Sequence, residues 1–403
     1  TSPPGACCNA QNVFDPVTGR FVRFPAFSGS HGWHWFRENY LSNSSVWTYD
    51  VPTNSWRDMR PVPAIHAKPL RCASWDADRQ VIVVFGGEGS NDGTVVYDPY
   101  DNSWTRRKPK NEPAPRSAGT MAYHRALKKH ILFGSQFTDD PHTWAYDLVK
   151  NEWTDLKPAV QPPTEKNDAV LAYDDVNEVI VASVRVFGQT NTAEEWHYET
   201  WVYEHTKNTW KKMNPAAEPP GGGQRRRLMV AIPDQNVVLM ENYVNPPQKV
   251  PGVEREQQIW TYRYGPTKKR PASATSGSLE LTDEGMLVAW RGPATSQWLI
   301  VRERGDHPWT VRESKTFVRS GDSEGLKTYI DKDVFRDEIV RYSIIAVDAE
   351  GQQSIPLRLR TQPRLVEDVV ASVHSPTKVT LAWPASTDLD VVGYIVERAP
   401  VEV

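Results

Sequence analysis

The sequence has little cysteine and methionine, and it has no long hydrophobic run. Of its 403 residues, 3 are cysteine and 6 are methionine. The cysteines are Cys7, Cys8 and Cys72, and an odd number with an adjacent pair does not form a disulfide framework. A single disulfide bond from Cys7 or Cys8 to Cys72 is one possibility, and the alternative is that these cysteines are buried free thiols. No apolar stretch approaches ~18 residues, so we expect no membrane-spanning segment.

Neither sign of charge prevails in the chain. Lys and Arg number 47 and Asp and Glu number 50, which gives a net charge of −3. This balance lacks the basic field that holds nucleic acids or anionic membranes, so we expect neither partner. We interpret the short basic runs 225–227 and 268–270 as solvated loop or linker charge. The chain starts at Thr1 without an initiator Met or a signal-peptide core, so we expect a processed or truncated piece.

Tryptophan (16) and proline (32) are abundant, which together with many β-branched runs indicates an all-β protein with many turns. Its main signal is a repeat of about fifty residues, in which a Tyr precedes a Trp by seven positions and an Asn stands two before the Trp. The four pairs are Tyr49 and Trp56, Tyr97 and Trp104, Tyr146 and Trp153, and Tyr203 and Trp210.

A second pattern lies upstream in each unit, where an aromatic residue and an Asp or His open a tight turn before a hydrophobic strand. The pairs begin at Phe14, Trp75, Tyr123 and Tyr173. Each unit therefore contains two hairpins, or four short antiparallel strands. A single such sheet cannot bury both faces, so we expect the units to stack around an axis as the blades of a propeller.

The segment 71–104 carries the fullest pattern, with Phe85-Gly86-Gly87, Tyr97 and Trp104. On these residues the chain resembles the kelch-repeat family over residues 7–265, although the paired glycines become Gly134-Ser135 in the third unit. We therefore assign residues 1–265 to a kelch-type β-propeller. Five repeats are visible, and the fifth lacks its closing strand. Kelch propellers usually have six or seven blades, so we expect a larger ring, with a self-contained five-bladed ring as the alternative.

The pattern changes after a polar linker at residues 266–276. Residues 277–363 resemble a fibronectin type III domain, which implies a β-sandwich with Trp290 in the core on the second strand and Tyr342 on the sixth. Residues 364–403 resemble the start of a second, incomplete copy, since 379–383 repeats the pattern of 287–290. Modules of this kind are usually spacers or interaction domains on exported proteins.

If the blades superpose, the loops between second and third strands gather at one end of the propeller. The candidate binding residues on this face are His31, Trp33, His34, Trp35, Phe36, Arg37, His142, Trp196, His197 and Tyr198. A metal site is one hypothesis, with His31 and His34 completed by His142 or His197. A sugar-binding or protein-binding surface is the second, because exposed aromatics supply contact area. The third is that these aromatics only pack the loops onto the blades.

Catalytic motifs do not assemble in this sequence. A galactose oxidase-like copper site needs a Cys linked to a Tyr and further His ligands, whereas the cysteines here fall on expected inner strands. A Ser-His-Asp motif and a Gly-rich phosphate loop are missing. We therefore expect no cofactor, and a non-catalytic binding or scaffolding protein of bacterial origin, in the periplasm or outside the cell, which joins a protein partner or larger complex. The alternatives are a carbohydrate-binding protein and a galactose oxidase-like enzyme.

Overall fold

The described part of the chain consists of β-strands, turns and a short 3₁₀ turn, in two compact units, Thr1–Lys268 and Lys269–Val403, which we describe separately. The computed structural model describes residues 11–24, 46–63, 65, 71–87, 93–114, 116, 120–135, 142–163, 169–186, 197–220, 227–244, 256–266, 270–333, 339–361, 369–375, 377–383 and 396. Within these residues, no helix is long and apolar enough to cross a bilayer. The expected all-β class is confirmed.

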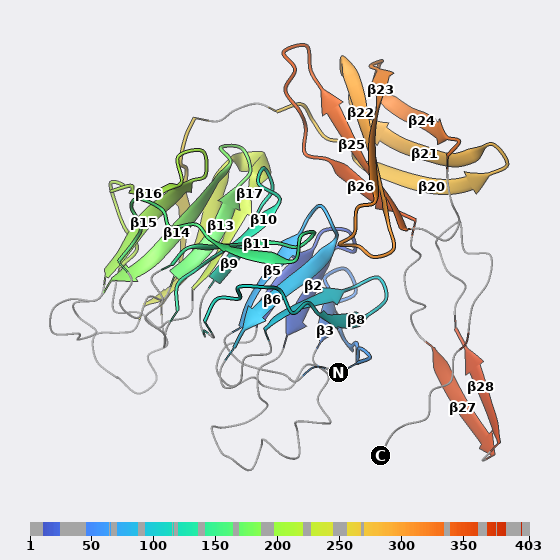
Figure 1. Ribbon diagram of the computed structural model, residues 1–403, viewed down its shortest axis with the longest axis horizontal. Helices are drawn as coiled ribbons and strands as arrows, with labels where there is room; N and C mark the ends of the chain where they lie inside the picture. Colours follow the sequence, from blue (N-terminus) through green and yellow to red (C-terminus); the bar gives the residue numbers. More distant parts are fainter. Residues whose placement is uncertain are drawn as a thin grey trace. The chain divides into compact units, whose positions relative to one another are not determined.

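The described part of the first unit forms five antiparallel sheets in chain order, which we call blades one to five (Figure 1). Blade one is β1 (Gln11–Asp15), β2 (Arg20–Phe24), β3 (Trp47–Asp50) and β4 (Ser55–Asp58). Blade two is β5 (Arg71–Asp76), β6 (Val81–Gly86), β7 (Thr94–Asp98) and β8 (Ser103–Arg106). Blade three is β9 (Thr120–His124), β10 (Lys129–Phe133), β11 (Trp144–Asp147) and β12 (Glu152–Asp155). Blade four is β13 (Ala169–Asp174), β14 (Val179–Val186), β15 (His197–Glu204) and β16 (Thr209–Lys212). Blade five is β17 (Leu228–Ile232), the 3₁₀ turn η2 (Pro233–Gln235), β18 (Val237–Val244) and β19 (Glu256–Tyr262).

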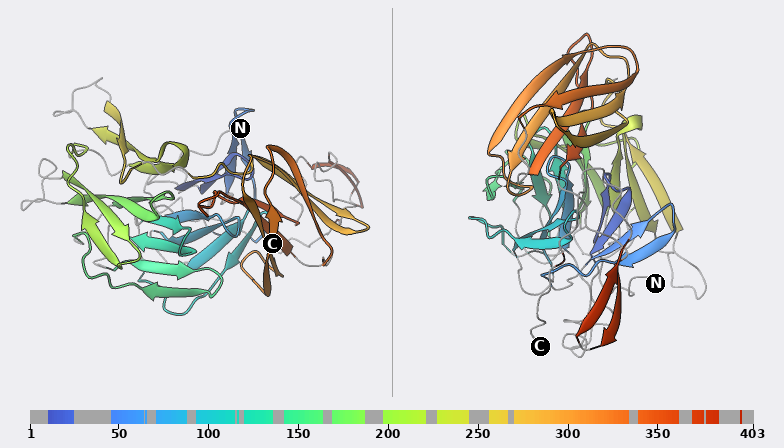
Figure 2. Two further views of the ribbon diagram at one scale, coloured as in Figure 1. Left: turned by 90° about the horizontal axis from the view of Figure 1, so that it is seen from above. Right: turned by 90° about the vertical axis from the view of Figure 1, so that its right-hand side faces the viewer.

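The first strands of successive blades, β1, β5, β9, β13 and β17, pack side by side in that order. The blades thus follow one another around a common centre (Figure 2). Among the described residues, β17 and β1 do not pack against each other in this way. The inner strands therefore form an open series in the structure.

The aromatic pairs open the inner hairpins as the sequence predicts. In blades one, two and four, Oδ1 of the aspartate (Asp15, Asp76 or Asp174) accepts the N–H two residues later at 2.9 or 3.0 Å. Blade three has His124 instead, and its Nδ1 accepts the N–H of Leu127 at 3.3 Å. Each side chain thus satisfies a backbone donor that the turn leaves without a ladder partner.

The Tyr and Asn of the repeat fix the outer hairpin of blades one to four. The Asn adopts the left-handed backbone region, with φ between 46° and 54°, and its Oδ1 accepts the Tyr hydroxyl at 2.7 or 2.8 Å. The four pairs are Tyr49–Asn54, Tyr97–Asn102, Tyr146–Asn151 and Tyr203–Asn208. Asn is favoured here because its short polar side chain tolerates this conformation better than most.

The same outer hairpins join each blade to the one before it. Asn208 Nδ2 donates to the carbonyl of Leu156 in blade three at 2.7 Å. Trp210 packs on Phe133, with ring centroids 5.3 Å apart, and its Nε1 donates to the Thr143 hydroxyl at 2.9 Å. The same contacts join blade three to blade two. Asn151 Nδ2 donates to the carbonyl of Arg107, the ring of Trp153 packs on Phe85, and Trp153 Nε1 donates to the Thr94 hydroxyl. We call this set of contacts the blade junction.

The second unit contains two sheets around one core. One sheet has the order β20 (Ser276–Thr282), β21 (Gly285–Gly292), β24 (Gly325–Asp331). The other has the order β23 (Glu313–Ser320), β22 (Gln297–Gly305), β25 (Ile339–Val347), β26 (Leu357–Arg360). Trp290 and Tyr342 are buried in the core between them, on the second and sixth strands, as predicted. Beyond this core, β27 (Val370–Ser375) and β28 (Lys378–Ala382) form a hairpin.

A buried ion pair crosses the core of this sandwich. Arg302 Nη1 on β22 contacts both carboxylate oxygens of Asp331 on β24, at 2.7 and 2.8 Å. Tyr342 donates its hydroxyl to the same carboxylate at 2.8 Å, and burial together with Asp331 raises the pKa of this tyrosine. The carboxylate thus accepts from both residues and supplies the buried guanidinium with a charge partner away from water.

Replacement of Asn208 by Ala should destabilise the propeller. The substitution removes two hydrogen bonds, each of which contributes about 1 kcal/mol to stability. It also places an alanine in the left-handed backbone region, which costs about 1–2 kcal/mol. We expect the free energy of unfolding in urea to fall by about 2–4 kcal/mol. Asn208→Gly is the matched control, because Gly tolerates this φ, and it should be the milder change. Equal losses would argue against a role for backbone conformation.

Asp331→Asn should destabilise the sandwich by about 1–3 kcal/mol, because Arg302 loses the charge of its closest partner and keeps only the partly exposed Glu313 and Asp333. Tyr342→Phe removes one hydrogen bond and should cost about 1 kcal/mol. Hydrogen exchange of β22 and β25 in the full chain measures both losses. A larger loss for Tyr342→Phe than for Asp331→Asn would contradict the importance of the ion pair.

Candidate functional site

The candidate face is the end of the propeller where the second strand of a blade passes to the third. Strands alternate in direction, so connections between successive blades emerge at this end too. We call it the loop end. Of the ten predicted binding residues, seven lie outside the described residues. They are His31, Trp33, His34, Trp35, Phe36, Arg37 and Trp196.

His142 and His197 lie at the loop end, each beside a carboxylate. His142 precedes β11, and its Nδ1 is 2.6 Å from Asp155 Oδ2 on β12. His197 is the first residue of β15, and its Nε2 is 3.4 Å from Glu199 Oε1. Each histidine is thus held by an acid of its own blade.

Glu199 contacts three residues of its own blade, His197, Trp201 and Lys212. Burial favours its neutral form, but the Lys212 ammonium and the Trp201 Nε1–H, which donates at 2.8 Å, outweigh burial and lower the pKa of Glu199. The carboxylate is therefore ionised at neutral pH and already paired within its sheet. It stabilises the end of blade four and is poorly placed to attack a substrate.

Tyr198 is not the exposed loop residue that we predicted. It lies on β15 opposite Arg185 of β14, and only 2% of it is exposed. The Arg227 guanidinium lies 4.0 Å from its ring centroid. The prediction is wrong because β14 and β15 have eight residues each, so their ladder extends through a segment taken as loop.

Four arginines are buried at the loop end, and sequence analysis proposed none of them for the site. Arg71 begins β5, Arg185 lies near the end of β14, and Arg116 and Arg227 precede β9 and β17. Between 1% and 4% of each residue is exposed. For Arg227 this corrects the interpretation of run 225–227 as solvated charge. No pattern in the sequence distinguishes these four from exposed arginines.

Two of these arginines have backbone contacts that hold the loop end together. Arg227 Nη1 donates to the carbonyl of Ser183 at 3.1 Å and to its Oγ at 2.6 Å. The carbonyl of Arg116 accepts the N–H of Gly87 at 3.0 Å, and a Cβ on Gly86, at φ +74°, would lie 2.5 Å from that carbonyl oxygen. The glycine pair of blade two therefore allows a close approach of the connection that carries Arg116.

The loop end thus contains four buried guanidinium groups, and charges act more strongly where water is excluded. Guanidinium groups match carboxylates in geometry and charge. The loop end therefore suits a partner that presents Asp, Glu or another carboxylate.

Cys72 is a buried free thiol in β5. Burial raises its pKa to about 12, although the charge of Arg116 acts in the opposite direction. A thiol of this kind is inert as a nucleophile at neutral pH. Cys7 and Cys8, the partners considered for a bridge, lie outside the described residues.

A metal site is not formed by the described residues, which contain no group of three or more His, Cys, Asp and Glu side chains able to hold an ion. The predicted set depended on His31 and His34, which lie outside them. The metal hypothesis therefore stays a prediction.

Ser74, His130 and Asp76 form a buried hydrogen-bonded chain between blades two and three. Ser74 Oγ is 2.6 Å from His130 Nδ1, and His130 Nε2 is 3.2 Å from Asp76 Oδ2. The order resembles a catalytic triad, but all three residues are buried, and Asp76 also caps its turn. A nucleophile must reach a substrate, so we assign this chain a structural role.

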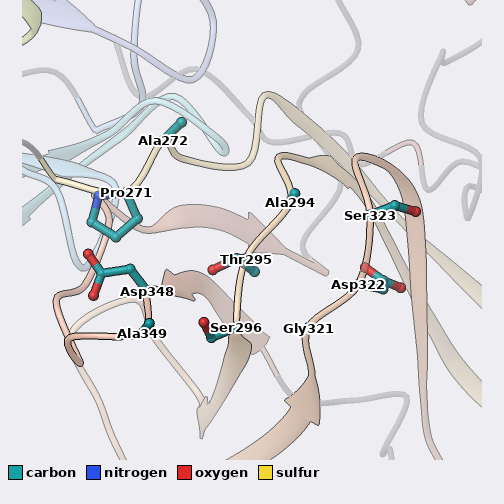
Figure 3. A pocket seen from close by; sticks show the side chains of 10 residues that line it. All are labelled: Pro271, Ala272, Ala294, Thr295, Ser296, Gly321, Asp322, Ser323, Asp348 and Ala349. Carbon is teal, nitrogen blue, oxygen red and sulfur yellow. The ribbon is translucent and has the colours of Figure 1, made fainter.

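A hollow of about 600 Å³ lies in the second unit, at the turns that Figure 3 shows. Its two carboxylates are already engaged. Asp322 accepts from Lys327 Nζ at 2.9 Å, and Asp348 Oδ1 accepts the N–H of Gln352 at 2.7 Å. The other residues that line the hollow have small side chains, and Thr295 and Ser296 lie between the two acids. It offers a sugar no aromatic face, so we do not assign it a ligand.

His124 and His205 pack together at the opposite end of the propeller. Their ring centroids are 4.6 Å apart, and His124 also lies 4.6 Å from the ring of Tyr173. Burial, reinforced by His205, lowers the pKa of His124 to about 3. The neutral imidazole is therefore the form that fits the fold.

Comparison with known proteins gives one family. Residues 27–240 match the family described as KLHDC2/KLHL20/DRC7 Kelch-repeats domain. None of the curated proteins compared matches the chain. A β-fructofuranosidase from Schwanniomyces occidentalis complexed with fructosyl-erythritol is similar in structure at 8% identity and a TM-score of 0.38, over 91% of this chain and 94% of that one. The Bombyx mori GH32 β-fructofuranosidase BmSUC1 is similar at 10% identity and a TM-score of 0.37, over 89% of this chain and 86% of that one. Likeness at this level supports no inference on activity.

The buried His124 should make the propeller less stable in acid. Its pKa is about 3 in the folded chain and near 6.5 when unfolded, so between these values the unfolded chain binds the extra proton. We expect the free energy of unfolding to fall as pH falls from 6.5 towards 3, by up to about 1.4 kcal/mol per pH unit from this group. His124→Asn keeps an acceptor for the Leu127 N–H and does not titrate. If both proteins lose stability equally over this range in urea titrations, His124 is not the cause.

Proposed function

Because this chain belongs to the Kelch-repeat family, we propose that its propeller is a non-catalytic module that binds another protein at the loop end. Kelch domains generally mediate protein interactions, which supports this class of function. The observation that carries the proposal is a set of four buried arginines at the loop end, Arg71, Arg116, Arg185 and Arg227. They favour a partner with exposed carboxylates.

In this proposal the scaffold and the loops have separate tasks. The blade junctions fix the strands whose ends form this face, so little ordering entropy is lost in the strands on binding. The buried arginines supply a field that steers a negatively charged partner to this end. The predicted aromatic residues, such as Trp33 and Trp196, would supply contact area. A carbohydrate ligand is the second candidate, because the same aromatics could stack on sugar rings.

We also propose that the second unit contains fibronectin type III-like modules that space or dock the propeller. The strand order β20-β21-β24 against β23-β22-β25-β26 supports this assignment, as does a buried Trp290 on the second strand. Modules of this type fit a bacterial protein that works in the periplasm or outside the cell. The five blades would belong to a ring of six or seven.

Native mass spectrometry with metal analysis, on protein isolated from its own source, tests the binding function. We expect a larger assembly without bound metal. A monomer with about one bound copper or zinc would contradict the proposal and favour a galactose oxidase-like enzyme. A monomer whose Trp fluorescence responds to a sugar would favour the carbohydrate-binding alternative.

The role of the arginines is tested with whichever protein co-purifies. Arg227→Gln should weaken its binding by up to about tenfold and should reduce the salt dependence, because it removes one buried charge from the field that steers the partner. Lys150→Gln is the matched control, because this exposed lysine lies in the outer turn of blade three, at the opposite end. Equal effects of the two variants would place the partner elsewhere.

A further inference from the structure

Strand β24 lies at one edge of the three-stranded sheet in the second unit (Figure 1). On one side it pairs with β21, from Gly325 opposite Gly292 to Asp331 opposite Met286. Among the described strands, none pairs with its other side. An edge strand of this kind presents a row of backbone N–H and C=O groups with which a further strand can pair.

The outer side of β24 carries no charged side chain. Leu326, Thr328 and Ile330 alternate along the strand with less exposed residues, and all three are exposed. Leu326 is 63% exposed and Ile330 37%. Natural edge strands are commonly protected by a charge or a proline, and the outer side of β24 has neither. This side of the strand is therefore suited to contact another apolar strand.

The two charged residues of β24 do not prevent such a contact. Lys327 and Asp331 are each 2% exposed, on the side of the strand that faces the core. Lys327 Nζ lies 2.9 Å from Asp322 Oδ1, and Arg302 contacts the Asp331 carboxylate at 2.7 and 2.8 Å. An inward charge protects an edge when a new strand would bury it without a partner. Both charges here are already buried and paired, so a strand beside β24 removes neither from water.

The edge strands of the other sheet, β23 and β26, do not fit a second copy of themselves. In an antiparallel pair of two β23 strands centred on Phe317, Lys315 of one strand would lie opposite Arg319 of the other. In a similar pair of two β26 strands, Arg358 would lie opposite Arg360. Like charges that lie directly opposite each other destabilise a pair of strands. These two edges are thus protected against pairing with themselves.

Strand β24, by contrast, is complementary to itself. In an antiparallel pair of two β24 strands centred on Thr328, Leu326 of one strand lies opposite Ile330 of the other, and the two Thr328 side chains lie opposite each other. On the core side, Lys327 lies opposite Tyr329. This register never places two side chains of the same charge opposite each other. Apolar pairs and Thr–Thr pairs across strands are among those that stabilise a sheet.

We infer that β24 pairs antiparallel with β24 of a second copy of this chain, around a two-fold axis at Thr328. The two three-stranded sheets then form one sheet of six strands. Because the same surface is used on both copies, the contact closes as a dimer and does not propagate. The inference concerns the second unit alone, and it goes beyond the binding proposed for the loop end and does not depend on it.

The contact is small, which sets its expected strength. One pair of seven-residue strands buries much less than the roughly 1,200 Å² of a stable interface. The dimer should therefore be weak and should depend on concentration, with a dissociation constant of about 0.1 mM. Its mass, twice that of the chain, distinguishes it from a complex with another protein.

The first test changes the charges at the facing positions of the full chain and measures association by sedimentation equilibrium. Leu326→Lys together with Ile330→Lys places like charges opposite each other twice, and should weaken association at least about tenfold. Leu326→Lys together with Ile330→Glu is the matched control, because it places opposite charges there. It should keep association within about threefold of the native chain. Two variants with the same association constant would contradict the inferred register, and a native chain that stays monomeric at about 1 mM would overturn the dimer.

The second test uses the position that lies opposite itself. Under mild oxidation, Thr328→Cys should link two full chains through a disulfide bond, because the two Cα atoms on the axis are within bonding range. Thr316→Cys is the matched control, since this residue is equally an exposed threonine but lies on β23. The native chain under the same conditions measures the background from its own cysteines. Equal linkage of the two variants would indicate random collision and overturn the inference. Linkage of Thr328→Cys to a different protein in an extract of the source would show that the partner strand is not a second copy, which also overturns it.

Discussion

The hydrogen bond from the turn asparagine of one blade to a carbonyl of the preceding blade is the contact on which the propeller depends. It exists only if the asparagine adopts the left-handed conformation, and the Tyr hydroxyl holds its other amide atom in place. It also exists only if the preceding blade has a fourth strand, whose end supplies the carbonyl. A local backbone preference thus determines how neighbouring blades pack, and each of these junctions stabilises both of the blades that it joins.

The junction between blades four and five departs from this rule on both sides at once. At the position of Phe85 and Phe133, blade four has Ser183, and the described part of blade five has no fourth-strand Trp to contact it. Arg227 contacts Ser183 instead and stacks on Tyr198. Arg227 holds the register position that Arg71 holds in blade two, so the buried cation at this position belongs to the repeat. Its contacts with Ser183 and Tyr198 are particular to the junction between blades four and five.

Much of the fold follows from spacing in the sequence. Tyr97 and Trp104 stand seven apart because the next pair of the hairpin, Asp98 and Ser103, and the turn between these two residues place them opposite each other. The same regularity predicts the turns after Asp15 and Asp76. The burial of Arg71, Arg116, Arg185 and Arg227 could not be predicted, since it depends on how connections cross strand ends. Tyr198 was misplaced for a related reason: strand length in blade four exceeds that of the repeat.

The pairing of Ser74 with His130 shows why geometry alone does not establish catalysis. The two residues are 56 positions apart, so only the packing of β5 beside β9 and β10 brings them together, and no sequence motif could indicate it. Their hydrogen-bond order is that of a nucleophile, base and acid. Catalysis also requires that a substrate reach the nucleophile and that an oxyanion form beside free donors. Here the histidine has no exposed surface, and its two nitrogens join a Ser and an Asp of the neighbouring blade. The same three side chains that could activate a hydroxyl in an open cleft instead tie blade three to blade two, as the turn asparagine does at the outer edge of the same junction.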